Sequence, residues 1–481
     1  MSSCSKMVYD AVIIGSGAGG SPIALELCKK GLNVVMLEKG QLLKPDTPQK
    51  ILEKYYVGQG FTISLNGGST IVLAGSAVGG TTAINSGTCF RPLQECLAQW
   101  DKITGLGFSD GLLDPYFPKV ENQLGVCVPN ASLLSKSATK IDEGLQKLRG
   151  EKSFILPRNS PNCSGKGLCC FCCPTKAKRS TDISYLPEAV EKGLHLMIGT
   201  KAIGIREESD LIRVVIETDG EKNEVRGKKL IISAGALYTP GLLKRNKLGD
   251  KYRLAGTHLK IHPANKVFAH FPGLKHGVGG IPQGTGYKPP ELPRITMEGI
   301  HTPESMTAPI VSAAGKRFNW WMKNHDDMAS FGLMVRDRGT GRVIDKGSFP
   351  VMSYLLHPED TKDFVNGLKL IGEIFFAAGA KRVLLPFLGP NQNEFEAAAQ
   401  LKSVDASAIS AKDIILSGFH PQGTAGIGRV VDQNLKLSGT KNIYVCDGSV
   451  LPDSPGVNPM ISIMAFSQRL GEYLYDKSGT S

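Results

Sequence analysis

Residues 8–38 read VYDAVIIGSGAGGSPIALELCKKGLNVVMLE, and this stretch decides the fold. Residues 8–14 are largely apolar, rich in β-branched side chains and closed by a glycine turn, which is typical of a buried parallel strand. Residues 21–31 predict a helix that stops at Gly31. Residues 32–37 predict a second apolar strand, followed by Glu38. The stretch is therefore a strand–helix–strand unit.

The turn between the first strand and the helix has the spacing G-x-G-x-x-G at Gly15, Gly17 and Gly20. The first glycine allows a tight turn, the second lets a diphosphate approach the backbone, and the third permits close packing of the helix. The helix N-terminus offers free N–H groups and the positive end of its dipole. Glu38 can accept hydrogen bonds from ribose hydroxyls. The unit predicts a dinucleotide site but does not distinguish FAD from NAD.

The composition is that of a globular protein with a sizeable core. Of 481 residues, 41% are hydrophobic and 21% are charged, which excludes a mainly disordered chain. The net charge of +12 is dispersed, so we expect no nucleic-acid partner. There is no apolar run of about 18 residues that would predict a transmembrane segment, and the first residues do not resemble a signal peptide. We therefore expect a cytoplasmic protein. Its excess charge is expected to keep it soluble or, as a weaker alternative, to guide an acidic redox partner or an anionic membrane surface.

Strands that lie far apart in the chain are expected to share one sheet. Residues 229–235 (KLIISAG) and 442–447 (NIYVCD) have the pattern of buried strands, as residues 8–14 do. Helices are predicted at 359–380 and from about Pro459. The sequence thus predicts a discontinuous α/β nucleotide domain into which the middle of the chain is inserted.

Further short segments stand out between residue 79 and residue 459. They are Gly79-Gly-Thr-Thr-Ala-Ile-Asn85, Ser233-Ala-Gly-Ala-Leu-Tyr-Thr-Pro240, His420-Pro-Gln-Gly-Thr424, Asp447-Gly-Ser449 and Asn458-Pro459. Together with the opening unit, they resemble the glucose–methanol–choline (GMC) flavoprotein oxidoreductases, in the same order and over nearly the whole chain. The resemblance implies an enzyme that binds FAD and oxidises an alcohol.

The resemblance also implies a domain arrangement. The expected fold class is α/β, a discontinuous Rossmann-like FAD-binding domain with an inserted α+β substrate domain built on an antiparallel sheet. The first part of the FAD-binding domain is expected at 1–262, with a Cys-rich segment at 160–185. The substrate domain is expected at 263–404, and the second part of the FAD-binding domain, with the catalytic pair, at 405–481.

Five more residues are expected to contact the cofactor if the resemblance holds. Gly79 and Gly80 have no side chains to block the flavin ring, and Asn85 offers an amide to it. Asp447 and Gly448 follow a predicted buried strand and would contact the ribityl–phosphate region. The alternative roles are an unconstrained loop for the glycines and a strand-end cap for Asp447.

His420 and Asn458 match the catalytic pair of the family. Oxidation of an alcohol by hydride transfer needs a base for the hydroxyl proton, and the usual pKa of histidine, about 6.5, suits this role. A neighbouring amide can fix the alcohol oxygen. We therefore expect His420 as general base and Asn458 as its partner. His262, in Lys-Ile-His-Pro, is interpreted as structural.

The Cys-rich segment has five cysteines close together in the chain. The spacing of Cys163, Cys169 and Cys173 resembles the segment that holds a 3Fe–4S cluster in some GMC dehydrogenases, with Cys170 and Cys172 as alternative ligands. Thiolates suit Fe–S clusters or zinc. We expect a 3Fe–4S or 4Fe–4S cluster. Zinc, or a loop without metal as in related long-chain alcohol oxidases, is the alternative.

Three functions follow in order of preference. The first is a dehydrogenase of small-molecule alcohols that passes electrons, through the Fe–S cluster, to an acceptor protein, with peripheral membrane association through that partner. The second is an alcohol oxidase that reduces O2 to H2O2. The third is an electron-transfer flavoprotein without alcohol turnover, which would not need the pair of His420 and Asn458. Phe318, Trp320 and Trp321 indicate either an apolar substrate wall or core.

Overall fold

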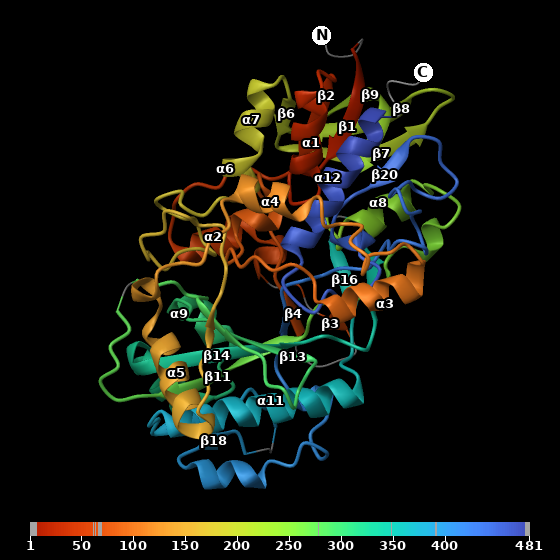
Figure 1. Ribbon diagram of the computed structural model, residues 1–481. Helices are drawn as coiled ribbons and strands as arrows, with labels where there is room; N and C mark the ends of the chain where they lie inside the picture. Colours follow the sequence, from red (N-terminus) through yellow and green to blue (C-terminus); the bar gives the residue numbers. More distant parts are fainter. Residues whose placement is uncertain are drawn as a thin grey trace.

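The computed structural model describes residues 7–60, 62, 64–65, 70–277, 279–347, 349–389 and 392–476. Figure 1 shows a mostly parallel sheet in the upper part of the molecule and a broad antiparallel sheet in the lower part. Within the described residues, no helix combines the length and the apolar character needed to cross a membrane.

The parallel sheet contains the predicted strand–helix–strand unit. β1 (Val8–Ile14) pairs in parallel with β2 (Val34–Glu38) and β9 (Glu221–Ile232), and α1 (Gly20–Lys29) connects β1 to β2. β20 (Ile443–Val445) also pairs in parallel with β9, so the first and last predicted strands lie in one sheet. The other members are β6 (His195–Ile198), β7 (Thr200–Glu207) and β8 (Ile212–Thr218).

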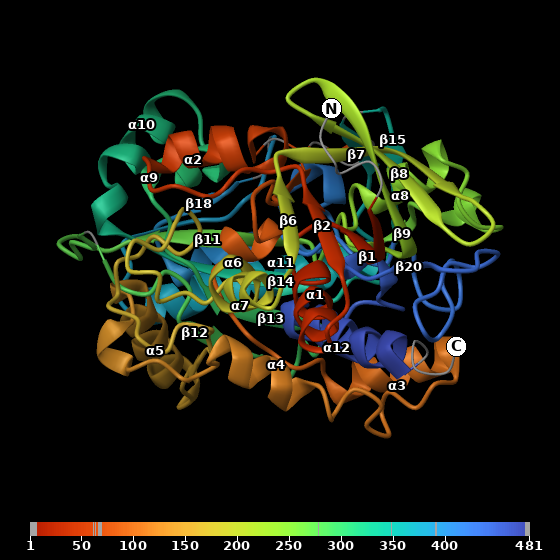
Figure 2. The ribbon, with the colours of Figure 1, turned by 90° about the horizontal axis from the view of Figure 1, so that it is seen from above.

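Apolar packing buries this sheet, as is usual for parallel strands. Every residue of β2 is buried. α1 packs against α12 (Met460–Asp476), and Figure 2 shows the two helices side by side. Gly471 lets them approach closely, because a Cβ there would lie 2.9 Å from the Cβ of Glu26.

The second sheet is antiparallel around its central strand. β14 (Met328–Val335) lies between β11 (Ala264–His270) and β13 (Ile295–Gly299). α11 (Pro358–Ala377) and α5 (Lys136–Arg149) pack on one face and bury an apolar core (Figure 1). The remaining strands are β12 (Thr285–Tyr287), β5 (Phe154–Ile155), β17 (Arg382–Leu384) and β18 (Glu394–Phe395). The expected fold class, a Rossmann-like α/β domain with an inserted α+β domain on an antiparallel sheet, is confirmed.

Some elements of the antiparallel sheet come from outside the expected segment 263–404. β5 and α5 precede that segment in the chain. β19 (Leu416–Gly418) follows it and pairs both with β11 and with β4 (Thr70–Val72). The helix expected at 359–380 is α11, which ends earlier because the chain turns at Gly379 with a φ of 97°.

The aromatic residues Phe318, Trp320 and Trp321 lie on α10 (Gly315–Lys323). Trp321 is fully buried and packs in a small core that includes Phe268. None of the three lines the cavity described below. Trp321 is therefore a core residue, Phe318 and Trp320 are half-buried and pack against that core, and none of the three forms a wall of this cavity.

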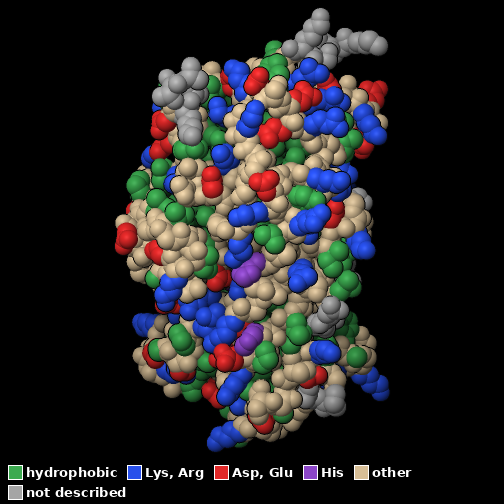
Figure 3. Space-filling model, turned by 90° about the vertical axis from the view of Figure 1, so that its right-hand side faces the viewer, with side chains coloured by type: hydrophobic (Ala, Val, Ile, Leu, Met, Phe, Trp, Pro, Cys, Tyr) green, Lys and Arg blue, Asp and Glu red, His purple; other side chains and the backbone are tan. Residues whose placement is uncertain are grey.

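The remaining elements are short. A small sheet contains β10 (Thr257–Leu259), β15 (Gly341–Asp345), β16 (Pro350–Ser353) and β3 (Ser64–Leu65). Further helices are α2 (Pro48–Tyr55), α3 (Gln94–Thr104), α4 (Phe117–Leu124), α6 (Thr181–Ser184), α7 (Leu186–Glu191), α8 (Thr239–Arg245) and α9 (Glu304–Thr307). On the face drawn in Figure 3, Lys and Arg side chains are spread from top to bottom among other residues.

Candidate active site

A cavity of about 700 Å³ lies between the two sheets. Its walls include the turn between β1 and α1, the segment 80–88, and the face of the antiparallel sheet that α11 and α5 leave uncovered. His420 and Asn458 also line it. The dinucleotide loop and the predicted catalytic pair thus share one cavity.

The three glycines of the motif have different surroundings. Gly15 has a φ of 102°, and a Cβ there would overlap the backbone oxygen of Ser233. A Cβ at Gly20 would overlap the backbone oxygen of Gly15. A Cβ at Gly17 would have no atom nearer than 3.8 Å, the Cα of Gly80. Gly15 and Gly20 therefore serve the fold, whereas Gly17 keeps the cavity open where a diphosphate would approach the backbone.

Two residues of this loop were not predicted from the sequence. A Cβ at Gly19 would overlap the backbone oxygen of Cys446, so this glycine lets the start of α1 pack closely against the end of β20. The Ser16 hydroxyl donates to Glu38 Oε2 at 2.7 Å and accepts from the Gly79 N–H at 2.9 Å. Ser16 thus connects three parts of the cavity wall. The doubled glycine was visible in the sequence, but nothing distinguished Ser16.

Glu38 is held rigidly at the end of β2. Its Oε2 also accepts from the Ser16 N–H at 2.9 Å, and its Oε1 accepts from the Gly40 N–H at 2.7 Å. Burial raises the pKa of Glu38. A carboxylate has about four acceptor sites and three are used here, so capacity remains for a ribose hydroxyl in the cavity that Glu38 lines.

The segment after Gly79 forms the wall opposite the loop. Gly80 and Asn85 line the cavity, whereas Gly79 itself does not. Gly79 has a φ of 90°, and a Cβ there would lie 2.9 Å from Asp182 Oδ1. The Asn85 Oδ1 accepts from the Gly87 N–H at 3.1 Å, and its Nδ2 lies 3.2 Å from the sulfur of Met460. Gly79 thus shapes the turn beside the cavity, Gly80 and Asn85 line it, and contact of any of the three with a cofactor stays a prediction.

Asp447 lines the cavity and also caps local structure. Its Oδ2 accepts from the Gly235 N–H at 2.9 Å and from the Thr239 hydroxyl at 2.6 Å, and its Oδ1 accepts from the Ser449 N–H at 2.8 Å. Burial raises the pKa of Asp447. The alternative role as a strand-end cap is therefore realised. Gly448 also faces the cavity, and contact of either residue with a cofactor stays a prediction.

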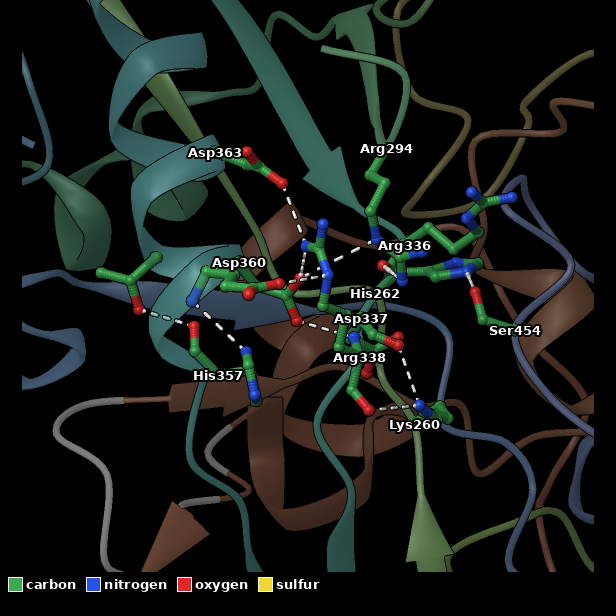
Figure 4. Close-up of polar contacts among 12 residues, drawn as sticks. Lys260, His262, Arg294, Arg336, Asp337, Arg338, His357, Asp360, Asp363 and Ser454 are labelled. Carbon is green, nitrogen blue, oxygen red and sulfur yellow. Dashed lines mark hydrogen bonds and ion pairs between the residues drawn. The ribbon is translucent and has the colours of Figure 1, made fainter.

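His420 and Asn458 are brought together as predicted. Asn458 Nδ2 lies 3.3 Å from His420 Nε2. His420 Nδ1 lies 3.0 Å from His262 Nδ1, and His262 Nε2 contacts the hydroxyl of Ser454, a contact drawn in Figure 4. His262, which the sequence analysis interpreted as structural, thus touches the predicted base directly.

These contacts define which nitrogens carry protons. Burial lowers the pKa of His420 to about 4, and burial together with His420 lowers that of His262 well below its usual value, so both rings are neutral near pH 7. Because the amide nitrogen of Asn458 only donates, His420 Nε2 is an acceptor and the ring proton sits on Nδ1. The Nδ1–H of His420 then donates to His262 Nδ1, while His262 Nε2 contacts the Ser454 hydroxyl and lies 3.4 Å from the amide nitrogen of Gln422.

The backbone at His262 supports a special role for this residue. Its φ is 49°, in the left-handed region that residues other than glycine rarely occupy. Such a conformation persists where surrounding contacts enforce it, often at a functional site. Here the conformation presents one imidazole edge to His420 and the other to Ser454.

Glu298 on β13 is a buried carboxyl group that the sequence did not single out. It lines the cavity, and Gln283 Nε2 donates to its Oε2. Neither Glu298 Oε1 nor Asn458 Oδ1 has a hydrogen-bond partner among the described residues. Burial raises the pKa of Glu298 to about 7, against a smaller opposing effect of Asn458. Its only signal in the sequence was a carboxyl group in a short run without other charged residues, Ile-Thr-Met-Glu-Gly.

The expected cluster ligands are not brought together. Cys169 is buried and its Sγ accepts from Arg158 at 3.2 Å, whereas Cys163 Sγ accepts from the Gly165 N–H and Cys173 Sγ lies beside Thr175. The alternates Cys170 and Cys172 do not complete a set either. No three His, Cys, Asp or Glu side chains gather to hold a metal ion in the described part of the chain. The structure therefore gives the Fe–S prediction no support, because its thiols face different partners.

The Cys-rich segment instead forms part of the cavity wall. The buried Lys178 donates to the backbone oxygens of Ala83, Asn85 and Cys169, each at 2.8 Å. The Tyr56 hydroxyl donates to the backbone oxygen of Cys170 at 2.7 Å. These hydrogen bonds hold the Cys-rich segment against the loop that contains Asn85.

Fold and site together define a dinucleotide-dependent oxidoreductase with two domains, and comparisons with known proteins agree. Two models of the GMC oxidoreductase family match residues 52–264 and 342–467. An uncharacterized GMC-type oxidoreductase of Mycobacterium tuberculosis is 32% identical over 472 residues, covering 95% of this chain and 74% of that protein. The chain therefore belongs to the GMC oxidoreductase family. A long-chain-alcohol oxidase of Arabidopsis thaliana is 27% identical over 520 residues, covering 96% of this chain and 67% of that protein.

Solved structures share the fold. Pyridoxine 4-oxidase from Mesorbium loti has a TM-score of 0.74 at 19% identity and covers 97% of this chain and 99% of its own. Formate oxidase of Aspergillus oryzae has a TM-score of 0.72 at 15% identity and covers 99% of both chains. Family membership supports FAD as the cofactor. The open space at Gly17 and the spare acceptor site of Glu38 fit that group.

Proposed function

We propose that this protein is an FAD-dependent oxidoreductase that oxidises an alcohol to a carbonyl compound, with His420 as general base. The observation that carries the proposal is the contact of His420 with Asn458 inside the cavity that also holds the dinucleotide loop. A flavoprotein that only transferred electrons would have no need of this pair.

The protein's own groups would act on the substrate hydroxyl. The unprotonated Nε2 of His420 accepts the hydroxyl proton, and the Nδ2 of Asn458 donates to the alcohol oxygen and so orients it. His262 holds the proton of His420 on Nδ1, which keeps Nε2 unprotonated, and acts as a positioning residue. The Asn458 amide that donates to Nε2 in this structure would donate to the alcohol oxygen when substrate is bound. Bound FAD supplies the acceptor for the hydride that leaves the alcohol carbon.

The low pKa of His420 sets the pH range of this chemistry. Burial disfavours the charged imidazolium and lowers the pKa to about 4. The base form is therefore present at neutral pH, and the reaction loses its base only as the pH falls through about 4.

The substrate side of the cavity supports an alcohol with an apolar part. Its lining includes Ile71, Leu73, Ile300, Leu333 and Met334. Long-chain-alcohol oxidases among the relatives are consistent with such a substrate.

An oxidase that reduces O2 to H2O2 is the second candidate. Two observations favour it. Some relatives are named long-chain-alcohol oxidases. Within the described residues, the cysteines of the Cys-rich segment do not form a metal site that could pass electrons from the flavin to an acceptor protein. A dehydrogenase that reduces another acceptor is the alternative outcome of the test below.

The test is anaerobic mixing of purified holoenzyme with a panel of primary and secondary alcohols. We expect bleaching of the flavin absorption by at least one of them, with one carbonyl product per flavin. Admission of O2 then separates the candidates, because stoichiometric H2O2 and fast reoxidation indicate an oxidase. Failure of every alcohol to reduce the flavin, while dithionite reduces it fully, would refute the proposal in favour of an electron-transfer flavoprotein.

A further inference from the structure

Three residues form one row across the centre of the antiparallel sheet. Lys266 on β11 pairs with Gly332 on β14, and Gly332 pairs with Glu298 on β13. Directly opposite residues in neighbouring strands point to the same face. The other face packs against α11 and α5 through residues such as Val267 and Phe331. The row therefore faces the cavity, and all three residues line it.

Lys266 is a buried cation without a counter-ion. Its side chain is 5% exposed, and its Nζ donates to the Thr302 hydroxyl at 2.7 Å. It forms no ion pair with any residue that the structure describes. An ammonium group has three donors, and within the described part of the chain one of them has a hydrogen-bond acceptor; Nζ also lies 5.3 Å from the centre of the Phe268 ring. Burial lowers the pKa of Lys266 to about 7, as expected for an ammonium that lacks a negative partner.

The middle of the row is Gly332, which places no side chain between Lys266 and Glu298. The side chain of Ile300 lies close by, 3.6 Å from where a Cβ of Gly332 would be. Two strand spacings, about 10 Å, separate the backbones of these two residues. Glu298 is 7% exposed, interacts with Asn458 and has an Oε1 without a partner among the described residues. The row thus begins beside the group expected to hold the alcohol and ends at an unpaired ammonium group.

We propose that the cavity binds an alcohol that also carries a carboxylate, with the hydroxyl at His420 and Asn458 and the carboxylate on Lys266. The proposal rests on the proposed function and adds a substrate class to it. A carboxylate would occupy the free donors of Lys266 and supply the missing counter-charge in a water-poor site, where charge-assisted hydrogen bonds are strong. The apolar chain of such a hydroxy acid would run along the cavity wall that contains Gly332, Ile300 and Leu333.

Binding is tested without turnover. Hexanoate is titrated into oxidised holoenzyme at pH 7 and followed by the change in flavin absorption, with hexanamide as the neutral comparison. We expect hexanoate to bind wild type at least about tenfold more tightly than hexanamide does. Lys266→Met should remove that difference, whereas Lys412→Met, at an exposed lysine, should retain it. Equal binding of the two compounds by wild type would overturn the proposal whether or not Lys266→Met folds.

Turnover separates this inference from the function on which it rests. Two substrates, 1-hexanol and its hydroxy-acid counterpart 6-hydroxyhexanoate, are compared by their specificity constants, kcat/KM. We expect wild type to prefer the hydroxy acid at least about tenfold, Lys266→Met to lose that preference, and Lys412→Met to keep it. Oxidation of both alcohols without any carboxylate preference would contradict the role of Lys266 and leave the alcohol oxidoreductase standing. Oxidation of neither would refute the proposed function itself.

Discussion

Replacement of His262 tests whether its hydrogen bond keeps the proton of His420 on Nδ1, so that Nε2 can accept the hydroxyl proton. Leucine at this position removes the acceptor of the His420 Nδ1–H at 3.0 Å but fills a similar space. Asparagine places an oxygen where the Nδ1 of His262 lies and tolerates the left-handed φ of 49°. The two variants therefore differ mainly in whether His420 keeps a hydrogen-bond partner on Nδ1.

The expected loss follows from the hydrogen bond that is broken. A buried donor left without a partner costs about 1–3 kcal/mol. That cost shifts neutral His420 toward the tautomer with its proton on Nε2, which cannot accept the hydroxyl proton. Because about 1.4 kcal/mol corresponds to tenfold, His262→Leu should slow flavin reduction about 5- to 150-fold. His262→Asn should stay within about fivefold of wild type.

The assay is anaerobic stopped-flow reduction of the bound flavin by a saturating alcohol. FAD content and melting temperature are measured for both variants, because leucine in a left-handed backbone conformation also costs about 1–3 kcal/mol of stability. Rates are compared at a temperature where both variants are folded and loaded with FAD. Equal rates for His262→Leu and wild type would refute the tautomer argument, and so would an equally slow His262→Asn.

Three other predictions concern the cofactor loop, the Cys-rich segment and the buried carboxyl group. Gly17→Val should fold but lack FAD, because a Cβ there enters open cavity, and retained visible flavin absorption would contradict this. Serine at the three cysteines expected as cluster ligands should leave flavin reduction within about threefold of wild type, and anaerobic reconstitution should add fewer than about one iron per chain by metal analysis. Burial raises the pKa of Glu298 from 4.5 to about 7, so the folded state retains a proton that the unfolded state loses. Stability should therefore fall as the pH rises from about 4.5 to about 7, by up to roughly 3 kcal/mol, and then level off. Glu298→Gln should flatten that decline in denaturant titrations, and an unchanged slope would show that another group causes it.

The parts that depend on local spacing could be predicted from the sequence. The opening strand–helix–strand unit and its glycine motif lie within one short stretch. Its elements could be predicted from the spacing of apolar residues in the strands and the helix and from the glycine turn between them. His420 and Asn458 came from their resemblance to a family pattern, and the structure places them in contact.

The parts that depend on long-range pairing could not be predicted. The contact of His262 with His420 joins positions 158 residues apart. The row of Lys266, Gly332 and Glu298 depends on the register of three strands, which no local pattern specifies. The Fe–S prediction finds no support in the structure, because cysteines that are close in sequence need not converge in space. Here the thiols of Cys169 and Cys163 have different partners.

The central claim is that His420 takes the proton of the alcohol. The direct test is the rate constant of anaerobic flavin reduction by an alcohol substrate in His420→Ala, measured by stopped flow in protein that retains full FAD. A positioned general base contributes typically ~10²–10⁴-fold, so we predict a fall of at least about 10²-fold. Reduction by His420→Ala at the wild-type rate would contradict the account.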